Sequence, residues 1–322
     1  MAISLTPVLA ALLLAAAQAD APKPPPPPPD PQFLFDLATS VGASGSTWAS
    51  LVYDRKHDEL FTVHAGLVHI FNDAGMETYV FGGDGDMGAP ERVGLLENGE
   101  ILVLTNMGGG RAIIRCDYRG ERLGMFDPAP LPKELGAFDP DRIRVANGKV
   151  HLVESSSMRV LVTDADAKVE QLVDLGAILR KRDPDLKIGL NGFWVDGQGN
   201  FYFTAPLSFT AFVMSPAREL RQFGSRGSSP GRFNIAGAIA TDERGWIFVL
   251  DRLRSVVIVF DPSLKFMLEF GYRGDGPENL IAPFDLAVGN GKVFVSQARD
   301  RGVKVFQYDF SKAAVRKLGD RP

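Results

Sequence analysis

The feature that most constrains the fold is a repeated segment near the end of the chain. Residues 223–233 (FGSRGSSPGRF) and 270–280 (FGYRGDGPENL) share phenylalanine, glycine, arginine, glycine and proline at matching positions. They begin at Phe223 and Phe270, 47 residues apart. Glycines between apolar runs recur at spacings of 46 to 51 residues, at Gly99, Gly148, Gly199, Gly245 and Gly291. A repeated unit of roughly forty to fifty residues therefore builds the chain.

The internal pattern of one unit predicts a small β-sheet. In the fifth unit, four runs rich in β-branched and aromatic residues are separated by turns, at residues 238–241, 246–249, 256–260 and 266–270. Four such runs predict a four-stranded antiparallel sheet, and repetition of that sheet predicts the blades of a β-propeller. An earlier unit over residues 51–63 turns at His57-Asp58 and brings the number to six. We expect an all-β, six-bladed β-propeller.

The last unit is one strand short, and the other end of the domain carries a spare strand. The sixth unit contains only the runs 284–288, 292–296 and 303–308, whereas residues 33–37 (FLFDL) have no partner in the first unit. Pairing this N-terminal strand into the last blade would close the ring and remove an exposed sheet edge. The sequence predicts this closure.

One stretch carries a family resemblance. Residues 242–251 (DERGWIFVLD), an arginine-containing loop, the strand 257–261 and the Phe-Gly-x-Arg-Gly segment resemble the NHL-repeat family of six-bladed propellers. The match is good in the fifth and sixth units, partial in the first, second and fourth, and poor in the third. The resemblance implies a propeller used to bind proteins, peptides or, in some eukaryotic members, RNA. A few members of the family are enzymes.

The N-terminal region predicts export. Residues 5–17 are an apolar run that is too short to span a membrane, and Ala17-Gln18-Ala19 suits cleavage before Asp20. We expect a signal peptide at 1–19, a proline-rich linker at 20–32, the propeller at 33–310 and a C-terminal tail at 311–322. This predicts a periplasmic or secreted protein with no transmembrane span after cleavage. A signal retained as an anchor and a disordered cytoplasmic tail are the alternatives.

Composition narrows the classes of partner. The net charge is −4, and lysine and arginine are spread along the chain, which argues against nucleic acid as a partner. The single cysteine, Cys116, lies in an apolar run and predicts a packed thiol rather than a disulfide. We expect a monomeric ring.

The binding site is expected on one face. Loops between the second and third strands of each blade, and connections from the outermost strand to the next blade, share a face that we call the upper face. Its two longest connections, 127–139 and 176–190, flank the third unit, and long loops on a rigid scaffold often carry binding residues. The residues predicted near the channel mouth are Glu91, Arg92, Asp141, Arg142, Arg182, Asn191, Phe193 and Asp285. They are either solvated charges and turn formers, or a polar pocket for a peptide or small polar ligand.

An arginine recurs in the second loop of most units, at Arg111, at Arg159, at Arg252 or Arg254, and at Arg299 or Arg301. Such arginines can hold neighbouring blades together through hydrogen bonds to carboxylates. They can also form a ring that recognises acidic groups. Because the NHL repeat pattern has an arginine here, the resemblance favours the structural role.

No convincing catalytic set is evident. The four histidines lie at scattered positions that do not predict a zinc site. Glu91, Asn191 and Asp285 could offer oxygen ligands to calcium, the one cofactor left open. The leading hypothesis is therefore an exported, noncatalytic module that binds a protein or peptide in the cell envelope. A calcium-dependent hydrolase, lactonase or lyase with its site at the channel mouth, and a scaffold subunit of an envelope complex, are the alternatives.

Overall fold

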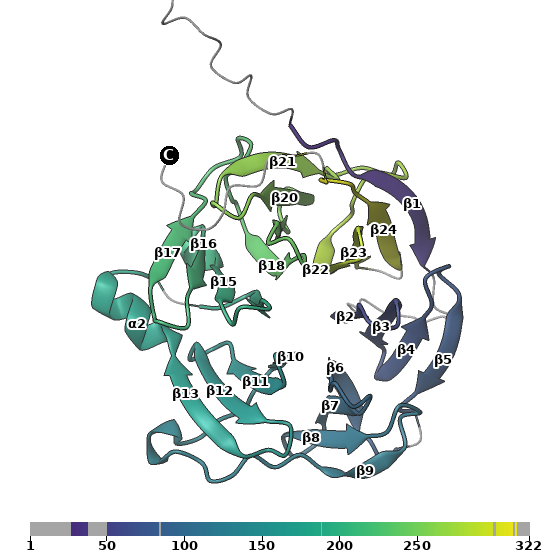
Figure 1. Ribbon diagram of the computed structural model, residues 1–322, viewed down its shortest axis with the longest axis vertical. Coiled ribbons are helices and arrows are strands. Elements are labelled where there is room, and N and C mark those ends of the chain that lie inside the picture. Colours follow the sequence, from purple (N-terminus) through teal and green to yellow (C-terminus); the bar gives the residue numbers. More distant parts are fainter. Residues whose placement is uncertain are drawn as a thin grey trace, which may run out of the picture.

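The predicted propeller is confirmed. The computed structural model describes residues 27–37, 50–83, 85–187, 189–298, 301–311 and 313. Over these residues, six four-stranded antiparallel sheets surround a central channel (Figure 1). The expected signal peptide, most of the expected linker and nearly all of the expected C-terminal tail lie outside the described residues, so these expectations stay predictions.

Five blades each use four consecutive strands, ordered from the channel outward. Blade 1 comprises β2 (Ser50–Asp54), β3 (Glu59–His64), β4 (Leu67–Phe71) and β5 (Glu77–Phe81). Blade 2 comprises β6 (Ala89–Leu95), β7 (Ile101–Asn106), β8 (Arg111–Cys116) and β9 (Arg122–Met125). Blade 3 comprises β10 (Arg142–Ala146), β11 (Lys149–Glu154), β12 (Arg159–Asp164) and β13 (Val169–Asp174). Blade 4 comprises β14 (Phe193–Val195), β15 (Phe201–Ala205), β16 (Thr210–Met214) and β17 (Leu220–Phe223). Blade 5 comprises β18 (Ala236–Thr241), β19 (Ile247–Asp251), β20 (Val256–Phe260) and β21 (Phe266–Phe270).

The sixth blade joins the two ends of the domain. It contains β22 (Pro283–Gly289), β23 (Lys292–Gln297), β24 (Val303–Gln307) and, on the outside, β1 (Gln32–Leu37). β1 runs antiparallel to β24, and the Phe33 and Phe306 rings meet edge to face with centroids 6.1 Å apart. Leu37 is buried in the core that blade 6 shares with blade 1. The predicted closure by an N-terminal strand is therefore confirmed.

The apolar runs fold as strands because they are buried on both faces between neighbouring blades. In blade 5, every residue of β18, β19 and β20 is buried, and Trp246 and Phe248 pack against Phe310 beyond β24. Continuous apolar runs are the pattern expected of strands covered on two sides. Cys116 is buried in this kind of environment, as expected of a packed thiol.

Five turns on the lower face, opposite the upper face, are closed in the same way. In each, a carboxylate oxygen of an aspartate accepts hydrogen bonds from the backbone N–H groups two and four residues later, which holds the tight turn closed. The five aspartates are Asp117, Asp164, Asp196, Asp242 and Asp261. Gly245 has a φ of +82° in the turn after Asp242, a conformation that favours glycine.

The two long connections contain short helices. The 3₁₀ helix η1 (Lys133–Leu135) lies in the first, and α2 (Leu175–Arg182) occupies the start of the second. Asp174 caps α2 by accepting a hydrogen bond from the N–H of Ala177 at 2.6 Å, and three basic residues follow in its last turn. α2 lies at the outer rim of the ring beside β13 and β17 (Figure 1). A further 3₁₀ helix, η2 (Pro206–Ser208), lies on the upper face. Within the described ranges, no helix has the length and apolar character needed to cross a membrane.

Candidate functional site

The upper ends of the innermost strands place charged side chains at the channel mouth. Arg92 on β6 lies with its Nη1 atom 3.2 Å from Oδ2 of Asp285 on β22. The same carboxylate oxygen accepts the backbone N–H of Leu51 at 3.1 Å. This ion pair therefore connects blade 2 to blade 6 across blade 1.

Two more arginines approach this pair. Arg142 on β10 donates from Nε to the hydroxyl of Ser155 at 2.9 Å. Burial, followed by the positive charge of Arg92, lowers the pKa of Arg142 to about 10, although Asp141 and Asp285 oppose the shift. The guanidinium groups of Arg252 and Arg92 lie 5.0 and 5.8 Å from the centre of the Phe284 ring. The mouth thus combines three arginines and an aromatic ring around one carboxylate.

The other predicted site residues have local roles. Glu91 accepts a hydrogen bond from Nε of Arg111 at 2.7 Å, and Asp141 accepts the N–H of Ser155 at 2.8 Å. Asn191 donates to the carbonyl of Ala236 at 3.2 Å. Phe193 lines the channel and packs edge to face on Phe201. Of the eight predicted residues, Arg92, Arg142, Phe193 and Asp285 line one cavity.

The expectation that Arg182 reaches the same ligand as Arg142 is wrong. Arg182 ends helix α2 at the outer rim, where its Nη1 atom lies 3.3 Å from the carbonyl oxygen of Leu220. The sequence showed a long connection next to blade 3, but the cap at Asp174 folds its first half into a helix that packs outside the ring. The length of a connection therefore did not indicate its direction.

The proposed calcium ligands do not form a set. Glu91 and Asp285 each face an arginine, and Glu91 does not line the channel cavity with Asp285. A calcium ion at the mouth would also lie among the guanidinium groups of Arg92 and Arg142, whose charge opposes cation binding. Among the described residues, no group of three histidine, cysteine, aspartate or glutamate side chains is arranged to hold a metal. None of the four histidines, all of which are described, lines this cavity.

The recurring arginines of the upper loops act as clamps on the connections between blades. Arg159 lies 2.5 Å from Glu154 and also donates to the carbonyls of Leu135 and Ala137. The other clamps are Arg111 to Asp139 at 2.7 Å, Arg254 to the carbonyl of Arg232 at 3.1 Å, and Arg301 to Asp275 at 3.3 Å. In blade 5 the clamp is therefore Arg254, whereas Arg252 turns to the mouth. Arg299 lies outside the described residues.

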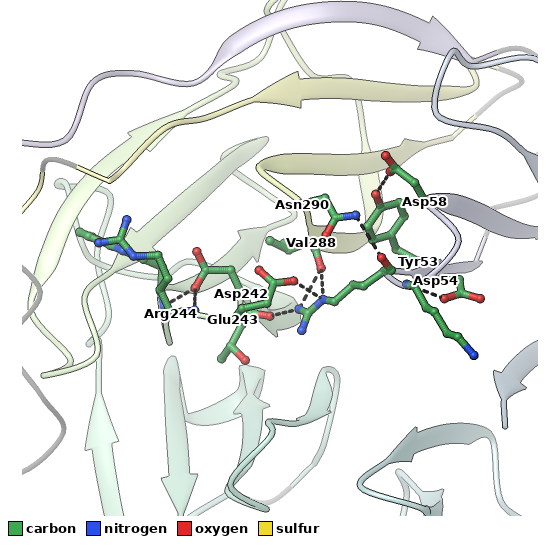
Figure 2. Close-up of polar contacts among 12 residues, drawn as sticks. Tyr53, Asp54, Asp58, Asp242, Glu243, Arg244, Val288 and Asn290 are labelled. Atoms are coloured by element: carbon green, nitrogen blue, oxygen red, sulfur yellow. Dashed lines mark hydrogen bonds and ion pairs between the residues drawn. The ribbon is translucent and has the colours of Figure 1, made fainter. Parts of the chain in front are cut away.

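The lower end of the channel contains an arginine that the sequence analysis missed. The Nη2 atom of Arg55, in the first turn of blade 1, donates to the carbonyls of Thr241 at 2.6 Å and Val288 at 3.0 Å. Its Nε atom lies 2.8 Å from Glu243. Figure 2 shows Glu243, Val288 and Asn290 converging here from blades 5 and 6. Arg55 therefore ties three blades together below the channel.

A second missed residue, Arg144, lies deeper in the channel. Arg144 on β10 stacks over the Trp194 ring, with the guanidinium carbon 3.4 Å from the ring centroid. Burial, and then repulsion by Arg55, lowers the pKa of Arg144 to about 9. The sequence signal was a basic residue within the otherwise apolar run of residues 143–145, two positions after Arg142 and so on the same face of the strand.

Exposed apolar side chains lie in the loops and connections of the upper face. They lie in the loops of blades 2, 4 and 5 and in the connections between blades: Met107, Leu131, Leu207, Ile235, Leu253 and Tyr272. Leu253 is the neighbour of Arg252 and is 61% exposed. Exposed apolar side chains and arginines on the same face are typical of surfaces that bind proteins.

Comparison with known proteins supports the fold. No protein-family model matches the sequence, so the resemblance to the NHL family is not confirmed, and no curated protein matches it. Among solved structures, a gluconolactonase from Xanthomonas campestris is 13% identical with a TM-score of 0.57, over 90% of this chain and 99% of that one. A catalytically inactive virginiamycin B lyase from Staphylococcus aureus, solved with quinupristin, is 12% identical with a TM-score of 0.55, over 83% and 82%. A Bacteroides thetaiotaomicron protein of unknown function is 11% identical with a TM-score of 0.59, over 86% and 73%.

These structures have in common with this chain an all-β, six-bladed propeller of four-stranded blades. At identities of 11 to 13%, the likeness concerns the fold alone. Propellers serve many unrelated functions, so the chemistry has to be argued from the residues of this channel.

Proposed function

We propose that this propeller is a noncatalytic binding module whose upper face recognises an acidic segment of a protein or peptide partner. The observation that carries the proposal is the convergence of Arg92, Arg142 and Arg252 on Asp285, the single acidic residue that lines the mouth cavity. Guanidinium groups recognise carboxylates through paired hydrogen bonds. The ligand should therefore present a carboxylate to the mouth.

The exposed apolar side chains support a macromolecular partner. Arginine and aromatic anchors in a central pocket commonly supply most of the binding free energy, and surrounding apolar contacts exclude water. The Phe284 ring beneath Arg92 and Arg252 offers such an anchor. Together these features suit an acidic segment that also carries leucine or an aromatic residue.

We also propose that the protein is exported and meets its partner in the cell envelope. The support is the apolar run at residues 5–17, the small residues before Asp20 and the proline-rich stretch that follows. The intact mass of protein recovered from the envelope fraction tests this, because export with cleavage gives a chain that starts at Asp20. Full-length chain in the cytosol would contradict it.

The binding proposal is tested with immobilised peptides of alternating glutamate and leucine, beside matched lysine-leucine peptides. The wild-type ring should bind the acidic series, with an affinity that falls as salt rises. The double substitution Arg142→Gln with Arg252→Gln should weaken binding tenfold or more, which corresponds to about 1.4 kcal/mol. The matched control is Arg119→Gln on the lower face, which should leave binding unchanged. If the control weakens binding and the double substitution does not, the face has been assigned wrongly.

The same double substitution separates the binding module from the scaffold alternative. Proteins that co-purify with the wild-type ring from envelope extract should be depleted with the variant if the mouth is the contact. An unchanged set of proteins would favour a scaffold that uses another surface. The calcium-dependent hydrolase alternative is tested separately, because gluconolactone hydrolysis that appears with calcium and disappears with chelator would replace the binding proposal.

A further inference from the structure

The channel contains a partly buried positive charge whose hydrogen bonding is incomplete. The guanidinium carbon of Arg144, on β10, lies 3.4 Å from the centroid of the Trp194 ring on β14. Stacking satisfies the face of the guanidinium, but its N–H donors point outward in the plane of the group. In the described part of the chain, no acceptor lies within hydrogen-bonding distance of the buried Nε atom. A buried donor without an acceptor is costly, and more so when it is charged.

The neighbouring charges do not compensate Arg144. The nearest strong electrostatic influence is Arg55, which is also positive and lies with its guanidinium 5.7 Å from the Trp194 centroid on the lower side. Glu243, a carboxylate at the lower end of the channel, pairs with Arg55. Burial and this repulsion lower the pKa of Arg144, yet at about 9 the group stays charged at neutral pH.

A small cavity lies next to this group. It has a volume of about 70 Å³ and is lined by residues of all six innermost strands, among them Arg92, Arg142 and Arg144. Asp285 is the single acidic residue of its lining, and it is paired with Arg92. A water needs roughly 10–15 Å³ by a comparable measure, so the space holds a few waters or one small ion. Three arginines against one aspartate make this cavity electropositive.

We propose that the central channel binds a free small oxyanion, a phosphate, sulfate or short carboxylate, against the guanidinium groups of Arg142 and Arg144, which both line this cavity. The anion would accept hydrogen bonds from their Nη donors and would offset the charge of Arg142 and Arg144. This site shares its cavity with the mouth residues Arg92, Arg142 and Asp285. It requires neither a peptide nor the upper apolar side chains, so a free anion can bind even if the partner-binding proposal fails. The chemistry is that of guanidinium groups with oxyanions.

The test measures thermal stability and binding heat of the full chain with sodium phosphate, sodium acetate and sodium chloride at constant ionic strength. In the wild-type protein, phosphate or acetate at tens of millimolar should raise the melting temperature by about 2 °C or more, and chloride should not. In Arg144→Met, this rise should vanish. The variant should also melt higher than wild type in oxyanion-free buffer, because a buried uncompensated charge has been removed. Arg221→Met is the matched control, since Arg221 bonds the carbonyl of Ser263 outside the channel, and it should keep the full rise.

Two results would overturn the proposal: an equal rise in Arg144→Met, or no difference among the three salts in the wild-type protein. A second measurement covers the case in which the variant does not fold. Crystals of the wild-type chain grown with selenate, an anomalous scatterer that replaces sulfate, should show a peak in the channel beside Arg144. Peaks confined to the surface would indicate an adventitious ion only and would contradict the site.

Discussion

The arginines of the upper loops and those of the channel have opposite surroundings. Arg159 and Arg254 each hold a carboxylate and a backbone carbonyl, and Arg111 holds two carboxylates. In the channel, Arg142 is bonded to a hydroxyl, and Arg144 is stacked on a ring with an unsatisfied Nε atom. The first group lies at the joints between blades, and the second lines a space.

This difference distinguishes arginines that stabilise the fold from arginines that can bind a ligand. A guanidinium whose donors are used by the protein stabilises the fold and has little left for a ligand. A guanidinium that is partly desolvated and lacks acceptors destabilises the protein without its ligand. An anionic ligand that supplies these acceptors removes this cost and therefore binds favourably. The burial and bonding of each arginine, rather than its place in the repeat, should decide its role.

The largest expected effect is a loss of stability in acid, and it involves a histidine packed between blades 3 and 4, beside the backbone of Arg144. His151 on β11 is buried beside Phe201, and its Nδ1 atom lies 3.2 Å from the carbonyl oxygen of Arg144, within hydrogen-bonding distance. Burial is the main cause that lowers the pKa of His151 from 6.5 to about 4. The hydrogen bond to the Arg144 carbonyl and the charge of Glu170 oppose this shift, whereas the positive charges of Arg144 and Lys149 add to it. As the pH falls, His151 is protonated first in the unfolded chain, because its pKa is higher there than in the folded protein. The free energy of unfolding should therefore be at its full value above pH 6.5 and should fall by up to about 3 kcal/mol as the pH drops to about 4.

Urea unfolding at pH 7.5 and pH 4.5 measures this loss. His151→Gln keeps a donor toward the Arg144 carbonyl but cannot be protonated, so its loss between the two pH values should be smaller than that of wild type. The exposed His57, replaced in the same way, is the control and should leave the wild-type loss nearly unchanged. Equal losses in wild type and His151→Gln would show that the interface between blades 3 and 4, beside the Arg144 backbone, tolerates an added charge.

The next effect concerns the clamp at Arg159. In Arg159→Ala, the carboxylate of Glu154, whose side chain is only 12% exposed, loses its positively charged partner. The carbonyls of Leu135 and Ala137 also lose their hydrogen-bond donor. We expect a loss of about 2 kcal/mol in the free energy of unfolding, measured by urea titration at pH 7.5. Binding of the acidic peptides should persist once the protein is folded, because the mouth is formed by other arginines. If Arg159→Ala kept the wild-type stability but lost peptide binding, the roles assigned to the arginines of the upper loops and of the channel would be reversed.

The fold was largely predictable from the sequence because its signals are local and repeated. Apolar runs between glycine turns gave the six blades, and the missing strand of the last unit predicted the pairing of β1 with β24. Helix α2 was not predicted, since its start depends on the side chain of Asp174 at the end of a strand. A cap of this kind is a single residue within a loop and has no periodic signature.

The site was predictable in part. Arg92, Arg142, Phe193 and Asp285 were expected near the mouth because they begin inner strands, and the structure brings them to one cavity. Arg55 and Arg144 were missed because their roles arise between blades. Arg55 reaches Thr241, 186 residues away in the chain, and Arg144 faces a tryptophan of the next blade. Contacts between units do not follow the period of the repeat, so spacing alone could not reveal them.

The smallest expected effect sharpens the comparison most directly. Arg301 occupies the same loop of its blade as Arg159 and also pairs with a carboxylate, but Arg301 is 46% exposed and its partner Asp275 is 84% exposed. Exposed ion pairs contribute roughly 0–1 kcal/mol because water and salt screen them. Arg301→Ala should therefore change the free energy of unfolding by less than about 0.5 kcal/mol in urea titrations run beside Arg159→Ala. A loss as large as that of Arg159→Ala would mean that position in the repeat, and not burial, determines the strength of these clamps.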